Sequence, residues 1–203
     1  LSALGTSTVI DFSTTVPGVN NGLFDAQAPV GDVSPATGQL DYDGWNYLSD
    51  GTAADAAQGA ANFPGAMPDG NGLGTGGSLV GGINAVDIGA THALAIQPTG
   101  SNWTSGSLTL RAQNNTGGPL EQLDVAFSVF VFNDADRSNS VRFYYSLTAA
   151  ADSWVEGTWA AVSSPDTPDA SSDWVEHPVA FTLGGVSINS GDIVYLRWVG
   201  DDI

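Results

Sequence analysis

Hydrophobic and polar residues alternate most regularly between positions 122 and 132. Every second residue of this segment is apolar and would share one face: Leu123, Val125, Phe127, Val129 and Val131. A period of two is typical of a β-strand with one face against a core, because successive side chains of a strand point to opposite faces. We therefore predict a strand here whose odd-numbered side chains are buried.

Strand-like segments recur at regular spacing from position 78 onward, and clusters of Gly, Pro, Asn and Asp separate them. They cover residues 78–88, 92–97, 107–113, 140–147, 158–162, 174–183 and 193–199. An earlier segment, 6–12, has strand-forming Val9, Ile10 and Phe12 ahead of a Thr-Val-Pro-Gly turn. About eight to ten strands without a strong helical period predict an all-β fold, a two-sheet antiparallel sandwich of jelly-roll type with long Gly/Asp-rich loops.

The region at about 19–77 is rich in Gly, Ala, Asp, Asn and Pro and contains only short apolar patches, such as residues 45–48. It predicts long loops around one or two strands, with a short helix at 53–61. The length of 203 residues fits one β domain, since sandwiches and barrels commonly reach about 200–250 residues as single units. We expect a single domain over 1–203 with a loop-rich insertion at about 19–77.

The excess of acidic over basic residues excludes some classes of partner. The chain has 22 acidic residues, of which only three are Glu, against four Arg and no Lys, and its net charge is −18. Such a surface repels phosphate backbones, so nucleic acid is not an expected partner. No apolar run approaches the roughly 20 residues that span a bilayer, so membrane insertion is not expected either. There is no Cys, and the start Leu1-Ser2-Ala3 suggests a mature chain after signal-peptide removal, hence a secreted or cell-surface protein.

Acidic and amide side chains alternate in several predicted turns, and this pattern favours calcium. Short Asp and Asn oxygens reach a common centre when a tight turn curls round a hard cation. No EF-hand loop is complete, because no Glu follows at the required distance, and solvated turns are the alternative. The candidate metal ligands are Asp41, Asp43, Asp69, Asn71, Asp134, Asp136, Asn139, Asp201 and Asp202.

Aromatic residues in loops offer a second kind of site. Exposed rings stack on pyranose faces, whereas Trp in sandwiches commonly packs between the sheets, and both interpretations stay open for this chain. The candidate ligand-binding residues are Trp45, Tyr47, Trp103 and Trp154.

Catalytic motifs are missing from the sequence. It contains no nucleophile elbow, no zinc-protease motif and no phosphate-binding loop. The two histidines, His92 and His177, could each belong to a serine triad, and Glu176 beside His177 and Trp174 is the one carboxylate that suggests glycoside hydrolysis. We predict that the protein is not an enzyme, with a glycan hydrolase as the least favoured alternative.

Residues 106–202 carry a series of motifs: Ser107-Leu108-Thr109-Leu110-Arg111, Asn114-Asn115-Thr116-Gly117, Val141-Arg142-Phe143-Tyr144-Tyr145-Ser146 and Val194-Tyr195-Leu196-Arg197-Trp198-Val199-Gly200-Asp201-Asp202. This half of the chain resembles β-sandwich ectodomains of exported bacterial proteins, which often bear sorting signals of the PEP-CTERM type. The resemblance implies a bacterial, extracellular β domain. It implies no particular activity, because most such domains have none assigned.

In similar domains the Asp-Asp pair is usually followed by one further strand, whereas this chain stops at Ile203. We therefore expect an open sheet edge that residues 1–12 of another copy fill, giving a self-associating polymer stabilised by calcium. Pairing of residues 1–12 within their own domain is the competing expectation. The leading prediction is a non-catalytic extracellular structural protein, a subunit of a surface fibre or matrix. The alternative is a carbohydrate-binding or adhesin module that binds glycans.

Overall fold

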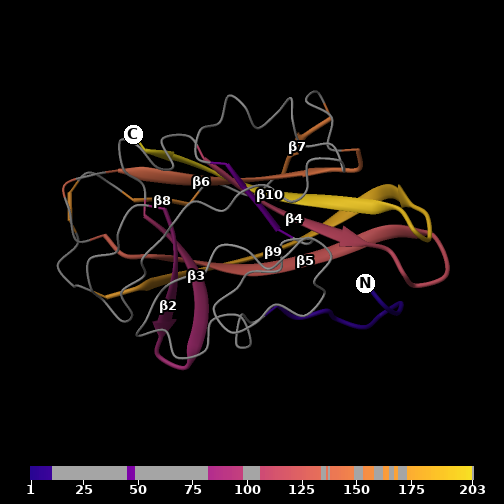
Figure 1. The fold of residues 1–203 in the computed structure, drawn as a ribbon, viewed down its shortest axis with the longest axis horizontal. Helices are drawn as coiled ribbons and strands as arrows, with labels where there is room; N and C mark the ends of the chain where they lie inside the picture. The colour runs from indigo at the N-terminus through magenta and orange to yellow at the C-terminus, as the bar shows by residue number, and fades with distance from the viewer. Residues whose placement is uncertain are drawn as a thin grey trace.

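The computed structural model describes residues 1–10, 45–48, 82–97, 106–133, 136, 138–148, 153–157, 162–164, 167–168 and 173–202 (Figure 1). This part of the chain is all β. Its strands are β1 (Trp45–Leu48), β2 (Gly82–Ile88), β3 (Thr91–Gln97), β4 (Ser107–Gln113), β5 (Leu120–Val131), β6 (Asn139–Ser146), β7 (Val155–Glu156), β8 (Val162–Ser164), β9 (Val175–Ile188) and β10 (Ile193–Asp202). Every pairing among them is antiparallel, and the described residues include no helix that could span a membrane.

A six-stranded sheet, called the large sheet below, is built around β10. Its order is β1-β4-β10-β6-β7, and β8 also pairs with β6. Strand β10 lies between β4 and β6, where Leu196 stands opposite Leu110 on one side and Tyr145 on the other. The last described strand of the chain is therefore central in its sheet and hydrogen-bonded along both sides.

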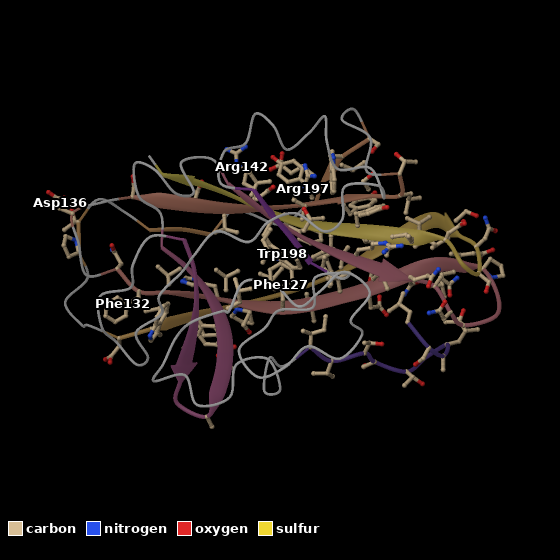
Figure 2. The ribbon with its side chains drawn as sticks, viewed as in Figure 1. Phe127, Phe132, Asp136, Arg142, Arg197 and Trp198 are labelled. Atoms are coloured by element: carbon tan, nitrogen blue, oxygen red, sulfur yellow. The ribbon has the colours of Figure 1, made fainter. Side chains whose placement is uncertain are left out.

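Strands β5 and β9 form a two-stranded sheet that packs against one face of the large sheet. As predicted, Val125 is buried while its neighbours Asp124 and Ala126 are exposed. The ring of Phe127 lies 5.6 Å from that of Phe143 and 5.3 Å from that of Trp198, centroid to centroid. Figure 2 shows Phe127 and Trp198 facing each other between the sheets. The core is therefore an aromatic layer shared by β5, β6 and β10, with Phe181 of β9 packed against Phe143 at 4.8 Å.

The turn from β4 to β5 is held by the side chain of Asn114, which is fully buried. Its Nδ2 donates to the carbonyls of Gly118 and Ile188, both at 2.8 Å, and its Oδ1 accepts from the Thr116 amide at 3.0 Å. Gly117 has a φ of 84°, which a residue with a side chain rarely adopts. This explains the Asn-Asn-Thr-Gly motif, because one amide both shapes the turn and ties it to the end of β9.

Several strands differ from their predicted bounds. The first predicted strand, 6–12, is not formed over residues 6–10, where Val9 is 78% exposed, because strand propensity needs a neighbouring strand to pair with. Strand β9 continues past the predicted end at 183 because Gly185, with a φ of 70°, accommodates a register shift opposite Leu120 and Gln122. The predicted helix at 53–61 and most of the insertion at 19–77 lie outside the described residues.

Candidate functional site

The large sheet has two faces, and each contains buried residues. The inner face packs on β5 and β9 through Leu110, Val194, Leu196, Phe143 and Trp198. Because strand side chains alternate, the odd-numbered residues of β4 and β10 and the even-numbered residues of β6 form the opposite side, called the outer face below. This outer face is largely polar, and its buried members are Ser107, Thr109, Tyr195, Arg197 and Ser146.

Three of the four cationic residues of the chain lie on the outer face. The register places Arg111 opposite Tyr195, Arg197 opposite Thr109, and Arg142 opposite Val199. The three arginines therefore form a diagonal across β4, β10 and β6, each shifted by one strand and two residues. Adjacent members have Cα atoms roughly 8 Å apart on ideal sheet spacings. Figure 2 shows Arg197 and Arg142 on the side of the sheet away from Trp198.

Arg197 is 2% exposed, and aromatic and hydroxyl groups surround its guanidinium. Its Cζ lies 3.5 Å from the centroid of the Trp154 ring, and its Nε donates to Thr109 Oγ1 at 3.1 Å. A cation over an indole face is attracted by the ring quadrupole, more strongly when water is excluded. Trp154 therefore covers a buried cation.

Tyr195 joins this group to Arg111. Its ring meets that of Trp154 edge-on at 6.5 Å, and its hydroxyl is hydrogen-bonded to the Arg111 side chain. Burial raises the pKa of Tyr195 above its ordinary value of 10.0, and the nearby charge and hydrogen bond of Arg111 oppose the shift in part. Arg111, Trp154, Tyr195 and Arg197 thus make one contiguous group, called the arginine–aromatic cluster below.

In the part of the chain that the structure describes, three buried polar atoms on or against the outer face have no hydrogen-bond partner: Ser107 Oγ, Arg111 Nε and Trp154 Nε1. Two of them belong to the arginine–aromatic cluster. Buried donors without a partner are rare in folded proteins because each costs about 1–3 kcal/mol in lost hydration. The cluster therefore holds hydrogen-bonding capacity that its own contacts do not use.

The predicted metal ligands are only partly described. Asp136 lies exposed in the connection between β5 and β6, and Asn139 stands directly opposite Asp202 in the β6–β10 ladder, beside Asp201. Asp41, Asp43, Asp69, Asn71 and Asp134 lie outside the described residues. Among the residues that are described, no three His, Cys, Asp or Glu side chains come together in a way that could hold a metal ion. The calcium prediction stays a prediction.

The predicted aromatic residues are separated. Trp154 belongs to the cluster, whereas Trp45 and Tyr47 lie on β1 opposite Leu110 and Leu108. Trp103 is outside the described part. Trp174, which was linked above to hydrolysis, packs on Phe132 at 5.2 Å, and the neighbouring carboxylate of Glu176 is exposed and accepts a hydrogen bond from Ser128 Oγ at 2.6 Å.

The sequence pattern overlooked Arg111, Tyr195 and Arg197 as site residues. The signal that could have found the two arginines is their position: Arg111 and Arg197 lie on the faces of their predicted strands opposite to Leu110 and Leu196, in strands that carry no other charged residue. A charged residue in such a strand requires a partner or a water-filled surface.

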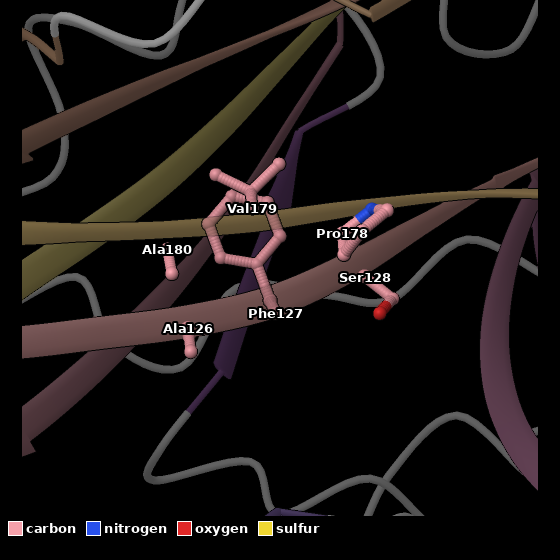
Figure 3. Close-up of a pocket in the computed structure, with 6 residues that line it drawn as sticks. All are labelled: Ala126, Phe127, Ser128, Pro178, Val179 and Ala180. Atoms are coloured by element: carbon pink, nitrogen blue, oxygen red, sulfur yellow. The ribbon is translucent and has the colours of Figure 1, made fainter.

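The outer side of the β5–β9 sheet carries a shallow hollow made by small side chains (Figure 3). Ala126 stands opposite Ala180, and Ser128 stands opposite Pro178. Polar contacts continue this face beyond the hollow, since Thr182 Oγ1 donates to Asp124 Oδ1 at 2.6 Å. The hollow offers no charged side chain of its own.

No family model, curated protein or solved structure matches this chain.

Proposed function

We propose that this chain is a non-catalytic extracellular structural protein of bacterial origin, a subunit of a surface fibre or matrix. Its fold is proposed to be a sandwich of jelly-roll type. Each subunit donates residues 1–12 as an extra strand to a neighbouring copy, and calcium stabilises the folded subunits. The observation that carries the proposal is the exposed apolar segment at residues 1–10.

This segment is held at one point. The backbone nitrogen of Leu1 donates to the carbonyl of Gln113 at 2.9 Å, and the carbonyl of Leu1 accepts from the amide of Asn115 at 2.9 Å. Beyond Leu1 the residues form no strand, and Leu4, Val9 and Ile10 are 66%, 78% and 46% exposed. An extended stretch with β-branched residues and exposed apolar side chains is suited to pairing with a sheet edge.

Strand β5 is the proposed acceptor. Among the strands that the structure describes, β5 and β9 pair only with each other, so each offers one outer edge. Proline is tolerated in a sheet where its nitrogen faces away from the ladder, so Pro178 removes a donor from the edge of β9. Strand β5 contains no proline over its 12 residues, and a donated strand could therefore pair along its length.

The charge of the chain supports the calcium part of the proposal. A net charge of −18 makes the compact state repel itself, and a divalent cation that binds only the folded form offsets this repulsion. The alternative of a glycan-binding or adhesin module needs Trp rings on one exposed face. Trp154, Trp174 and Trp198, whose side chains are described, each pack against an aromatic ring or a guanidinium instead.

The test is sedimentation of the intact chain and of variants, in calcium and in EDTA. We expect the intact chain to form concentration-dependent polymers in calcium. Deletion of residues 1–12, or the double change Val9→Ser and Ile10→Ser, should leave a folded monomer, and added peptide 1–12 should bind the deleted form. Ser128→Pro should also block assembly, because Ser128 faces Pro178 and would lose its outward backbone donor. It would also lose the exposed side-chain bond to Glu176, which Ser128→Ala removes alone as its control.

Val155→Ser is the matched control, since it removes an apolar side chain of exposure similar to that of Ile10 outside residues 1–12, and its polymers should match those of the intact chain. An intact chain that stays monomeric at high concentration in calcium would overturn strand donation. Polymers that persist in the Val9 and Ile10 double variant would do the same, even if the deletion variant fails to fold.

A further inference from the structure

The arginine–aromatic cluster gathers positive charge in a protein that has almost none. Arg111 and Arg197 lie on adjacent strands of the same face, one diagonal step apart, and Arg197 is almost completely buried. Like charges at this separation repel each other, and the repulsion grows as water is excluded. A negative group beside Arg111 would offset this repulsion.

Two donors of this cluster have no partner among the described residues. Arg111 Nε and Trp154 Nε1 are both buried and both lack a hydrogen-bond acceptor. Both side chains contact Tyr195, Arg111 through its hydrogen bond to the hydroxyl and Trp154 through its ring. Because guanidinium and indole nitrogens only donate, the missing partner must be an acceptor. In the described part of the chain, no acidic side chain forms an ion pair with Arg111.

The chemistry of the donors limits the ligand. A planar guanidinium matches a planar carboxylate, which accepts from it in two parallel hydrogen bonds. Tyr195 and Arg197 are buried, whereas Arg111 and Trp154 are partly exposed, so a ligand would reach the cluster at Arg111 and Trp154. We propose that the arginine–aromatic cluster binds a small carboxylate, which accepts hydrogen bonds from Arg111 Nε and Trp154 Nε1. This site is independent of the proposed strand donation.

The carboxylate could come from a free carboxylic acid or from the acid group of a uronic sugar. In a uronate, the pyranose ring would extend outward past the edge of Trp154. Both sources present the same group to Arg111, and they differ in what lies outside the cluster. Parallel titrations with acetate and with glucuronate therefore distinguish them.

The test is binding of sodium acetate and sodium glucuronate to the intact chain in EDTA, at a dilution where the chain is monomeric and at constant ionic strength. We expect saturable heat in calorimetry and a rise in Tm of roughly 5–10 °C at a hundredfold excess over Kd. Sodium chloride and glucose should give neither. Tighter binding of glucuronate than of acetate would assign the sugar acid, and equal binding would assign the free carboxylate.

Two variants locate the site. Arg111→Gln should weaken acetate binding at least tenfold, because it removes a charge-assisted donor. Arg142→Gln is the matched control: it removes the same charge from an exposed position on the same face, and it should change Kd less than twofold. Trp154→Phe keeps a ring over Arg197 but removes the indole donor, and it should weaken binding severalfold.

Absence of saturable binding to the intact chain at 100 mM ligand, on the order of the weakest specific affinities, would overturn the proposal. Equal weakening by Arg142→Gln and Arg111→Gln would also overturn it, because the effect would then be general attraction to positive charge. If Arg111→Gln does not fold, unchanged binding by Trp154→Phe is the result that rejects the site.

Discussion

The two faces of the large sheet show two ways of being buried. On the inner face Phe143 and Trp198 pack against Phe127 without any polar requirement. On the outer face Arg197 is equally buried, but it needs the ring of Trp154 and the hydroxyl of Thr109. Strand periodicity sets which residues lie on each face. The stability of the inner face depends on how well its side chains fill the core, and that of the outer face on hydrogen-bond and ring partners for its buried polar groups.

Phe143→Ala should produce the largest loss of stability. The ring is 1% exposed and contacts those of Phe127, Phe181 and Trp198, so its removal leaves a cavity in the aromatic core. We expect the free energy of unfolding in urea to fall by about 3–5 kcal/mol. Val155→Ala, at a half-exposed position on the edge strand β7, should change it by less than about 0.5 kcal/mol.

A loss below about 1 kcal/mol in Phe143→Ala would mean that the inner face relaxes round the cavity. The two faces would then not differ in the way proposed, because the inner face would no longer depend on tight packing.

Thr109→Val should have an intermediate effect. Valine has almost the shape of threonine, so the packing stays while Arg197 Nε loses its acceptor in a place that excludes water. We expect a loss of about 1–3 kcal/mol in urea unfolding, the cost of a buried donor left without a partner. Thr182→Val makes the same change at an exposed position, where water can replace the bond to Asp124, and should cost less than about 0.5 kcal/mol. Equal losses in the two variants would contradict a special polar requirement on the outer face.

The sequence predicted the inner face far better than the outer face. Alternation located β4 at residues 107–113 and the buried side of β5, because apolar periodicity directly reports a face against a core. The outer cluster depends on which strands are neighbours. Arg111 and Arg197 are 86 positions apart in the chain, and only the register of β4 against β10 brings them together.

The same limit explains the error at residues 6–10. Val9 and Ile10 have the composition of a strand, yet a strand forms only where another chain segment offers hydrogen bonds, and composition does not contain that information. Which of the predicted calcium ligands lie near each other was unpredictable for the same reason. Asn139 and Asp202 stand opposite each other only because β6 pairs with β10 in this register.

The pH-dependent effect of Tyr195→Phe should be the smallest of the three, and it should appear only at alkaline pH. Burial raises the pKa of Tyr195 in the folded protein above the value of about 10 expected in the unfolded chain, although Arg111 opposes the shift. Above about pH 10 unfolding therefore releases a proton, and the free energy of unfolding falls as the pH rises toward the folded pKa. Below pH 10 this contribution is intact.

Urea unfolding between pH 8 and 11.5 should show a shallower alkaline decline in Tyr195→Phe than in the intact chain. Tyr144→Phe, which removes a hydroxyl from the same face of β6, is the control for loss of a tyrosine on this face. Identical alkaline slopes for the intact chain and Tyr195→Phe would mean that water reaches Tyr195. The outer face would then not be a buried polar counterpart of the inner face.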